Sequence, residues 1–216
     1  MRKNFEKSLD RLNESLIEMG TMVTDAIKHS VKALKDKDVV LAQQVIDNDA
    51  NINAKEKEVE TMAVELLLRE QPVASDLRFV TSILKIITDL ERIGDQASDI
   101  AFLNLKLTRR NYEVEDLGSV IEMTRIVIAM VEDVIKAHVT GDSELAAEIV
   151  RRDLKVNDLY VKVRKEVIQD IKSESFGTKS SLDIFMIAKY LERIGDHADN
   201  IGRRVYYSIK GEHLED

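Results

Sequence analysis

The sequence predicts an all-α fold made of two tandem three-helix bundles related by a pseudo-twofold axis. One proline and eight glycines among 216 residues leave little material for turns, so the elements must be few and long. Apolar residues recur every three or four positions along most of the chain, which is the period of an amphipathic helix. The two halves of the chain also match each other, and an internal repeat indicates a repeated structural unit.

Apolar stripes define three helices in the first half. The first stripe runs from Phe5 to Leu34 and the second from Leu41 to Leu66. The third helix follows the segment REQPVAS, in which Ser75 is a candidate N-cap, and it ends near residue 108. Helices of about 30 residues span roughly 45 Å, so each bundle is expected to be elongated.

The second half repeats this pattern. It predicts helices at about 119–140, 143–173 and 181–210, with Ser181 as the candidate N-cap of the last. The segment RRNYEVEDLG, residues 109–118, is the predicted linker. The chain therefore divides into a first three-helix repeat at 1–108 and a second at 119–216.

The hexapeptide LERIGD marks the repeat most clearly, because it occurs at Leu90–Asp95 and again at Leu191–Asp196. These copies are 101 residues apart, whereas the dipeptide EM recurs with an offset of 104, at 18–19 and 122–123. The second half therefore lacks three residues (104 minus 101) at the turn that contains Pro72 in the first half.

Each hexapeptide also places a glycine, Gly94 or Gly195, inside a predicted helix. Glycine in a helix interior costs about 1 kcal/mol relative to alanine. Its presence at both equivalent positions, on the apolar side of the helix, predicts the close approach of a neighbouring helix.

Composition excludes several classes of function. A net charge of −8 and a pI near 5.2 argue against broad binding to nucleic acid or to anionic lipid. The absence of cysteine rules out disulfides, zinc–thiolate sites and thiol catalysis. The N-terminus lacks the apolar core of a signal peptide, and no apolar run reaches the roughly 20 residues of a membrane span. We therefore expect a cytoplasmic protein.

Acidic residues form a first row along two neighbouring helices. Glu91, Asp95 and Asp99 lie at positions i, i+4 and i+8 of the third helix and share one side, whereas Asp89 points to the opposite flank. The second helix carries a comparable row: Asp49, Asn53, Glu56 and Glu60. Folding the chain back at residue 73 brings the two rows to matching heights. Whether they face a shared groove or a splayed surface depends on the handedness of the bundle, which the pattern leaves open.

The second repeat carries a related set. Glu192, Asp196 and Asn200 follow the same spacing, with Asp199 nearby, and they are expected to face Asp153 and Asn157. The positions of Glu56 and Glu60 hold Tyr160 and Arg164 instead, and Arg203 is close. This set is therefore the poorer cation site. We refer below to Asp49, Asn53, Glu91, Asp95 and Asp99 as the first acidic cluster, and to Asp153, Asn157, Glu192, Asp196 and Asn200 as the second acidic cluster.

The clusters have two interpretations. In the first interpretation they belong to a solvated surface, on which Arg92 and Arg193 neutralise the acids, because rows of charged residues usually lie at the surface. Alternatively they form carboxylate-rich metal sites, because oxygen-only ligands favour hard cations such as Mg, Mn, Ca or iron. Residue patterns alone leave both open.

No motif indicates catalysis. None of the four histidines has a glutamate three residues before it, so the ligand pattern of di-iron bundle oxidases is absent. His197 is interpreted as a surface residue. There is no phosphate-binding glycine loop and no nucleophile elbow. Met19, Met62, Met123 and Met186 have core spacing and are expected to pack inside. The protein is predicted not to be an enzyme.

Three segments carry a family resemblance: REQPVASDLRFV, DLERIGDQASDIA and YLERIGDHADNIGRRVYY. In a duplicated three-helix chain of this length they resemble the PhoU family, over essentially the whole chain. The resemblance implies a cytoplasmic negative regulator of phosphate uptake and of the phosphate-starvation response. Such a regulator is expected to act as an adaptor between the ATPase subunit of a phosphate ABC transporter and a sensor histidine kinase, and to meet the membrane only through these partners.

The resemblance also implies a metal cluster and its ligands. Some members bind multinuclear clusters through a Glu/Asp-x-x-x-Asp motif, which here corresponds to Glu91–Asp95, Asp95–Asp99 and Glu192–Asp196. The expected cofactor is a divalent or trivalent metal (iron, Mn, Mg or Zn). Arg203 stands where members often carry a glutamate, which counts against full occupancy of the second cluster. Arg78, in SDLR, also matches the family and is expected to brace the helix turn or to contact a partner.

Several alternatives remain at this stage. The chain could serve a low-affinity phosphate permease, it could be a carboxylate-bridged metalloenzyme, or it could be a helical scaffold without metal. Long helical faces flanked by apolar residues are also compatible with a homodimer.

Overall fold

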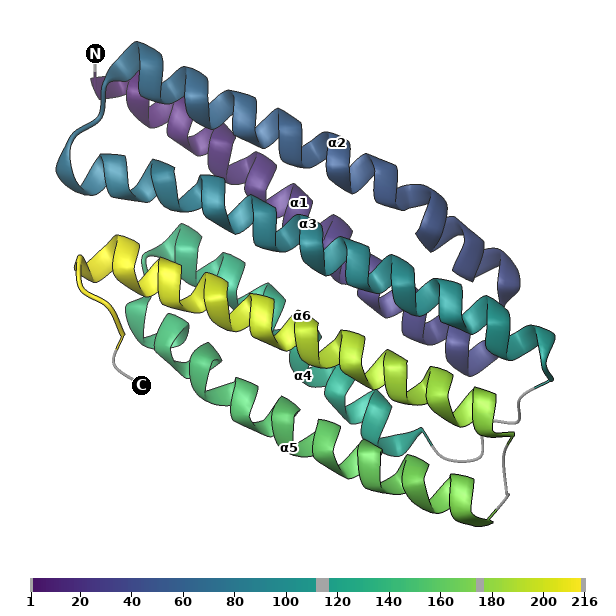
Figure 1. Ribbon diagram of the computed structural model, residues 1–216. Helices are drawn as coiled ribbons and strands as arrows, with labels where there is room; N and C mark the ends of the chain where they lie inside the picture. Colours follow the sequence, from purple (N-terminus) through teal and green to yellow (C-terminus); the bar gives the residue numbers. More distant parts are fainter. Residues whose placement is uncertain (1, 112–116, 174–176, 215–216) are drawn as a thin grey trace.

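The computed structural model of the chain describes residues 2–111, 117–173 and 177–214, with side chains from Phe5 onward. These residues form six helices and, within the described ranges, no strand: α1 Arg2–Asp36, α2 Val39–Glu70, α3 Ala74–Arg109, α4 Gly118–Thr140, α5 Ser143–Ser173 and α6 Thr178–Lys210 (Figure 1). The predicted all-α fold class is confirmed. Within the described residues, none of the helices is both long enough and apolar enough to cross a bilayer.

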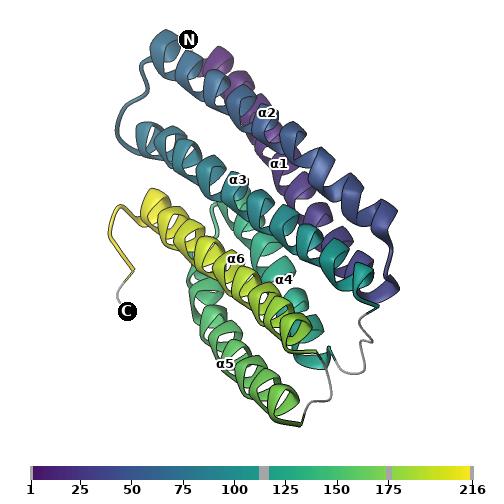
Figure 2. The ribbon, with the colours of Figure 1, turned by 45° about the vertical axis from the view of Figure 1, so that its right-hand side comes forward.

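The helices pack as two three-helix bundles. Helices α1, α2 and α3 contact one another, as do α4, α5 and α6, and the bundles meet where α3 contacts α6 and α1 contacts α4. Figures 1 and 2 show α3 and α6 side by side in opposite directions, with α2 and α5 on the outer sides. This is the arrangement expected of a pseudo-twofold axis between the repeats.

Two predicted helix starts were wrong. Helix α3 begins at Ala74 after Val73, which makes no side-chain capping bond, so Ser75 lies inside the first turn. Helix α6 begins after Gly177, and Ser181 is a buried residue within the helix. Apolar spacing identifies the body of a helix, but the residue at which the backbone becomes helical depends on the path of the preceding loop.

The boundary between the repeats lies partly outside the described residues. Helix α3 ends at Arg109 and α4 begins at Gly118, whereas residues 112–116 of the predicted linker are not among those described. The division at 109–118 therefore stays a prediction.

The core contains most of the predicted apolar positions. Met19 and Met123 are fully buried, as expected, but Met186 is 38% exposed, so its assignment to the core was wrong. Its neighbour Ile187 is fully buried instead. Where two apolar residues are adjacent, helical spacing does not decide which one faces the core.

The LERIGD glycines lie where neighbouring helices approach, which confirms that prediction. A Cβ atom on Gly94 would lie 3.1 Å from both the Cδ1 and Cγ2 atoms of Ile52 in α2. A Cβ atom on Gly195 would lie 2.9 Å from Asp153 Oδ1 and 3.2 Å from Val156 Cγ1 in α5. The glycines therefore allow α2 to pack closely on α3 and α5 on α6.

Polar contacts join the bundles along α3 and α6. Asp89 of α3 is only 6% exposed and lies 2.9 Å from His197 Nδ1 through Oδ1, while its other oxygen accepts from Arg204. Arg204 Nη1 also donates to the carbonyl oxygen of Lys85 at 2.9 Å. The interpretation of His197 as a surface residue was wrong, because its side chain contacts Asp89 of the other bundle. Helical spacing could not reveal this contact, since the two residues lie 108 positions apart in the sequence.

Replacing Gly20 by alanine is expected to destabilise the contact between the bundles. A Cβ atom there would lie 2.9 Å from Ile135 Cγ1 of α4. Overpacking costs about 1–3 kcal/mol, and the gain in helix propensity offsets about 1 kcal/mol of this, so we expect a net loss of about 1 kcal/mol, and at most about 2 kcal/mol, in the free energy of unfolding. Urea denaturation measures it. Gly177→Ala, whose Cβ atom would meet nothing within 4 Å, is the control, and an unchanged Gly20→Ala variant would contradict this account of the interface.

Candidate acidic metal site

The first acidic cluster forms where α2 packs against α3. Glu91, Asp95, Asp49 and Asn53 are all half-buried, and Asn53 Nδ2 donates to Asp49 Oδ2 at 3.3 Å. The close contact of Gly94 with Ile52 holds the two helices together at this height. The rows predicted to lie level with each other are therefore brought together.

The charges of the cluster act on one another. Burial raises the pKa of Asp95, and the carboxylates of Asp49 and Asp99 raise it further. Burial also raises the pKa of Glu91, followed by the charges of Asp95 and Glu56. The pKa of Asp49 is raised by burial and by Asp99, although its bond from Asn53 opposes the change. A cation placed among these groups would relieve both the repulsion and the desolvation.

Two buried oxygens of the cluster have no hydrogen-bond partner in the described part of the chain. These are Asp49 Oδ1 and Asn53 Oδ1, and unbonded buried acceptors of this kind suit a hard cation. Among the described residues, however, no three His, Cys, Asp or Glu side chains are arranged to hold a metal ion. The cluster thus has the donor atoms of a hard-cation site, but its side chains as they lie do not enclose one.

Asp99 connects the first cluster to the other bundle. Its side chain is exposed, and it hydrogen-bonds with Tyr190 of α6, whose pKa is raised by burial and by the neighbouring Asp99 charge. The sequence analysis missed Tyr190. It directly precedes the second LERIGD hexapeptide, as Asp89 precedes the first, and this position gives no sign of a partner in the other repeat.

The second acidic cluster centres on Asp153 of α5. Asn157 Nδ2 donates to Asp153 Oδ2 at 2.7 Å, and Asp153 Oδ1 is buried and has no hydrogen-bond partner among the residues that the structure describes. Burial, followed by the charges of Asp196 and Asp199, raises the pKa of Asp153 to about 6. The pKa of Asp196 is raised by burial and by Glu192.

Basic side chains compensate part of the second cluster. Lys189 pairs with Glu192, and Arg203 Nε donates to Asp199 Oδ2 at 3.0 Å. Lys189 was missed, although its spacing of three residues from Glu192 is that of an intrahelical ion pair. Asn200 does not join Asp153; it is exposed and lines a groove between α3 and α6 with Arg203 and Arg204.

Arg78 lies in the first turns of α3, beside the end of α6. A Cβ atom on Gly211, the residue that ends α6, would lie 3.5 Å from Arg78 Nη2. The Nε atom of Arg78 is buried and has no hydrogen-bond partner among the described residues. The structure therefore places Arg78 against the C-terminus of α6, on the wall of the groove that contains Asn200.

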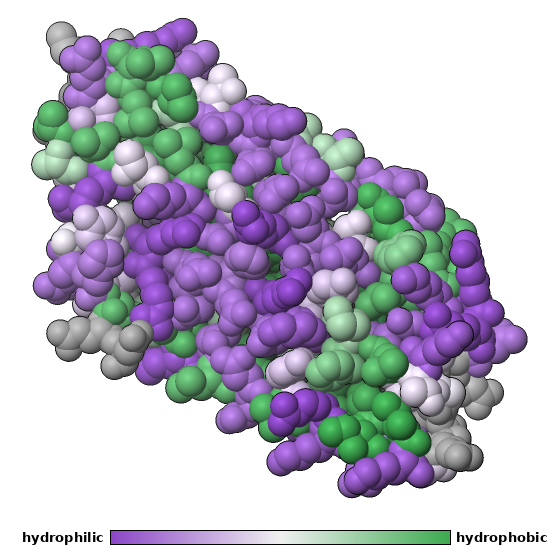
Figure 3. Space-filling view, in the orientation of Figure 1, coloured by the Kyte–Doolittle hydropathy of each residue, from purple (hydrophilic) through white to green (hydrophobic). Residues whose placement is uncertain are grey.

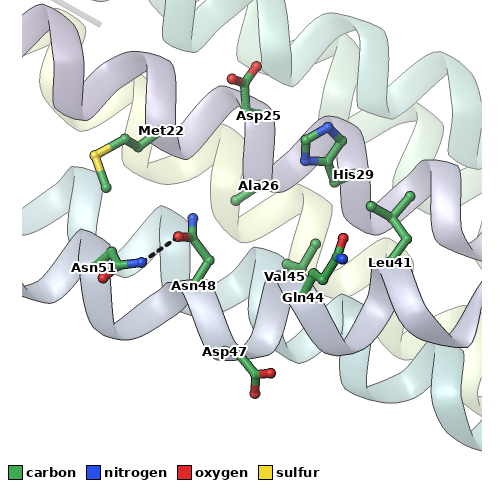
Figure 4. A pocket seen from close by; sticks show the side chains of 10 residues that line it. All are labelled: Met22, Asp25, Ala26, His29, Leu41, Gln44, Val45, Asp47, Asn48 and Asn51. Carbon is green, nitrogen blue, oxygen red and sulfur yellow. Dashed lines mark hydrogen bonds between the residues drawn. The ribbon is translucent and has the colours of Figure 1, made fainter.

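A separate groove lies between α1 and α2, away from both acidic clusters. It has a volume of about 540 Å³, and its lining includes Asp25, His29 and Asn48 (Figure 4). Asn51 Nδ2 donates to Asn48 Oδ1 at 2.7 Å, and both Asp25 and His29 are exposed. The acidic side chains of this groove do not converge with those of the first acidic cluster. The volume of the groove therefore does not make it a better candidate metal site than the cluster.

Known proteins resemble the chain along its full length. The PhoU domain matches twice, at residues 16–103 and 120–205. The phosphate-specific transport system accessory protein PhoU homolog of Clostridium acetobutylicum is 32% identical over 99% of this chain and 98% of its own length. The PhoU accessory protein of Escherichia coli K12 is 32% identical over 96% of this chain and 86% of its own length.

Solved structures agree with the fold. The crystal structure of PhoU from Pseudomonas aeruginosa has a TM-score of 0.91 at 34% identity and covers 96% of this chain and 100% of that chain. The crystal structure of the phosphate transport system regulatory protein PhoU from Streptococcus pneumoniae has a TM-score of 0.88 at 29% identity. The match covers 98% of this chain and 99% of that chain.

Replacing Asp153 by asparagine is expected to stabilise the metal-free protein at high pH. Its pKa is raised in the fold to about 6 from 3.8, so the folded state keeps a proton that the unfolded chain releases, and stability falls as the pH rises between these values. That difference sets a limit of about 3 kcal/mol, which solvent screening reduces to about 1–2 kcal/mol. Denaturation at pH 8 should show this gain, and at pH 4 it should disappear.

Asp158→Asn, at an exposed position on the same helix, is the matched control and should change stability little at either pH. An equal gain for Asp153→Asn at pH 8 and pH 4 would show that the effect does not come from its charge.

Proposed function

The chain belongs to the PhoU family, and we propose that it restrains a phosphate ABC transporter and keeps a sensor histidine kinase inactive while phosphate is plentiful. The observation that carries the proposal is similarity over the whole length to accessory proteins of a phosphate-specific transport system. Both repeats and the linker region are covered, so the similarity is not confined to one bundle. The family is one of phosphate-transport accessory proteins, and we propose no catalytic activity for this chain.

The surface supports a role in docking. Exposed apolar residues gather around the α2–α3 turn: Val64, Leu68, Val73 and Leu77 are 41%, 72%, 74% and 42% exposed. Figure 3 shows apolar surface at this end of the molecule and a hydrophilic belt along its middle. Apolar patches of this kind favour protein contacts, and two bundles fixed to each other could hold two partners at a constant separation. The adaptor acts in the cytoplasm and meets the membrane through its partners.

Metal binding would add rigidity to this adaptor. The first acidic cluster would supply Asp49, Asn53, Glu91, Asp95 and Asp99 as oxygen ligands, and a hard cation would neutralise their mutual repulsion. The buried oxygens of Asp49 and Asn53 that lack a partner among the described residues support this choice. The second acidic cluster would bind more weakly, because Lys189 already pairs with Glu192, and Arg203 pairs with the neighbouring Asp199. The role of the chain's residues is to hold α2 against α3, and α5 against α6, at these heights.

Deletion and complementation test the regulatory role. Cells that lack this protein should express phosphate-starvation genes in high phosphate, because the kinase is no longer restrained, and the intact chain should restore repression. Affinity purification of the tagged chain from the same phosphate-replete cells should recover both the transporter ATPase subunit and the kinase. Recovery of neither, with unchanged gene expression in the deletion strain, would refute the adaptor.

Other functions predict different outcomes. An accessory protein of a low-affinity permease would affect phosphate uptake in cells that lack the ABC transporter, whereas the proposed adaptor would not. A metalloenzyme would show turnover with the purified, metal-loaded chain. The same purification, analysed by light scattering, would test the expected homodimer.

Asp95→Asn tests the metal site. Removing one carboxylate from the centre of the first acidic cluster should lower the metal content and weaken cation binding at least tenfold, because a metal ligand is lost. Elemental analysis of protein purified without chelators, followed by calorimetric titration with Mn²⁺ and Mg²⁺, measures both. Asp47→Asn is the matched control, since Asp47 is exposed on α2 and accepts a hydrogen bond from Gln43, which is not a member of the cluster. Equal metal content in wild type and Asp95→Asn would exclude this site.

A further inference from the structure

A second groove, between the first half of α3 and the last turns of α6, has an unusual charge. It has a volume of about 450 Å³, and its lining includes four basic side chains, those of Arg78, Lys85, Arg203 and Arg204, but, among the described residues, no Asp or Glu. The chain as a whole has 40 acidic and 32 basic residues. We propose that this basic groove binds the phosphate group of a small anionic ligand. The proposal goes beyond the adaptor function and does not rest on it.

Two of the four basic side chains are fixed by acids from the helices. Arg203 Nε donates to Asp199 Oδ2 at 3.0 Å, and Arg204 donates to Asp89 and to the Lys85 carbonyl oxygen. These contacts hold the guanidinium groups in place on the α6 side of the groove. They also compensate part of their charge.

The other two basic side chains are not compensated. Among the described residues, neither Arg78 nor Lys85 has an acidic partner, and the Nε atom of Arg78 is buried without any hydrogen-bond acceptor. Arg78 lies against Gly211 at the end of α6, so its orientation is set before a ligand enters. The guanidinium group of an arginine that lines a groove is suited to a phosphate, which can accept two parallel hydrogen bonds from it.

The size of the groove points to more than a bare ion. A volume of about 450 Å³ lies in the range of small-molecule sites, about 300–1,000 Å³. Tyr207 and His213, whose rings stack with centroids 4.7 Å apart, complete its rim. A phosphate ester or a short polyphosphate therefore fits the groove, with inorganic phosphate as the smallest member of the class.

The internal repeat carries most of these charges at one end of the α3–α6 contact only. At the LERIGD offset of 101, Arg203 and Arg204 correspond to Phe102 and Leu103, and Lys85 corresponds to Met186. Only Arg78 has a basic equivalent, Lys179. The other end of the same α3–α6 contact is thus built with apolar residues, and Phe102 and Met186 are 50% and 38% exposed there. Arg204 does join the bundles through Asp89 and the Lys85 carbonyl oxygen, but no such contact accounts for the side chains of Arg78 and Lys85 among the described residues.

Calorimetric titration of the intact chain tests the proposal. The probes are inorganic phosphate, tripolyphosphate and ATP, at about physiological ionic strength and with EDTA present, so that metals on the acidic clusters cannot bind phosphate. We expect binding of at least one probe. The order of affinity then distinguishes the free ion from a polyphosphate or a nucleotide as the ligand.

Substitutions locate the binding. Arg78→Gln and Lys85→Gln should each weaken it about tenfold, since each removes a charge-assisted hydrogen bond. Lys179→Gln is the matched control, because it makes the same charge change at the equivalent position outside the groove, and it should leave affinity unchanged. Lys85 is exposed, so Lys85→Gln keeps the test valid if Arg78→Gln unfolds, which thermal melting would reveal.

Two results would overturn the proposal. One is the absence of binding by all three probes. The other is an equal loss of affinity in Lys85→Gln and Lys179→Gln, which would indicate unspecific attraction to basic charge. Neither result would bear on the adaptor function, which is read from gene expression and partner recovery.

Discussion

The packing of α2 on α3, and of α5 on α6, at a helix-interior glycine is the constraint on which the acidic clusters depend. Because Gly94 and Gly195 have no side chain, Ile52 and Val156 reach the backbone of the neighbouring helix. This approach brings acids of both helices to the same height and excludes part of the water that would otherwise screen them. The raised pKa values of Asp95 and Asp153 are the electrostatic result.

The two clusters differ in how that electrostatic strain is relieved. In the second cluster Lys189 and Arg203 supply positive charge from α6 itself. In the first cluster the carboxylates of Asp49, Glu91 and Asp95 form no ion pair among the described residues, and a buried oxygen of Asp49 accepts no hydrogen bond. The two repeats therefore share the same helix geometry but differ in the charge balance of their clusters.

The contact between α3 and α6 has diverged in a similar way. Near the middle of this contact, Asp89 contacts His197 and Arg204 of the other bundle. Asp99 forms a hydrogen bond with Tyr190. Beyond these contacts one end carries the basic groove and the other exposes Phe102 and Met186. A pseudo-twofold body thus presents two unlike ends, which suits a protein that must distinguish one partner or ligand from another.

The sequence by itself determined the six helices, their duplication and the two clusters, because helical spacing places residues on a face before any tertiary contact forms. It determined the purpose of the glycines as well, since only a close neighbour explains their cost at both positions. Tertiary structure decided which residues meet across repeats. His197 pairs with Asp89 and Asn200 lies in the basic groove rather than beside Asp153, and the start of α6 precedes Ser181. These features depend on the angle at which two bundles meet and on the path of loops, and neither follows from a period along one helix.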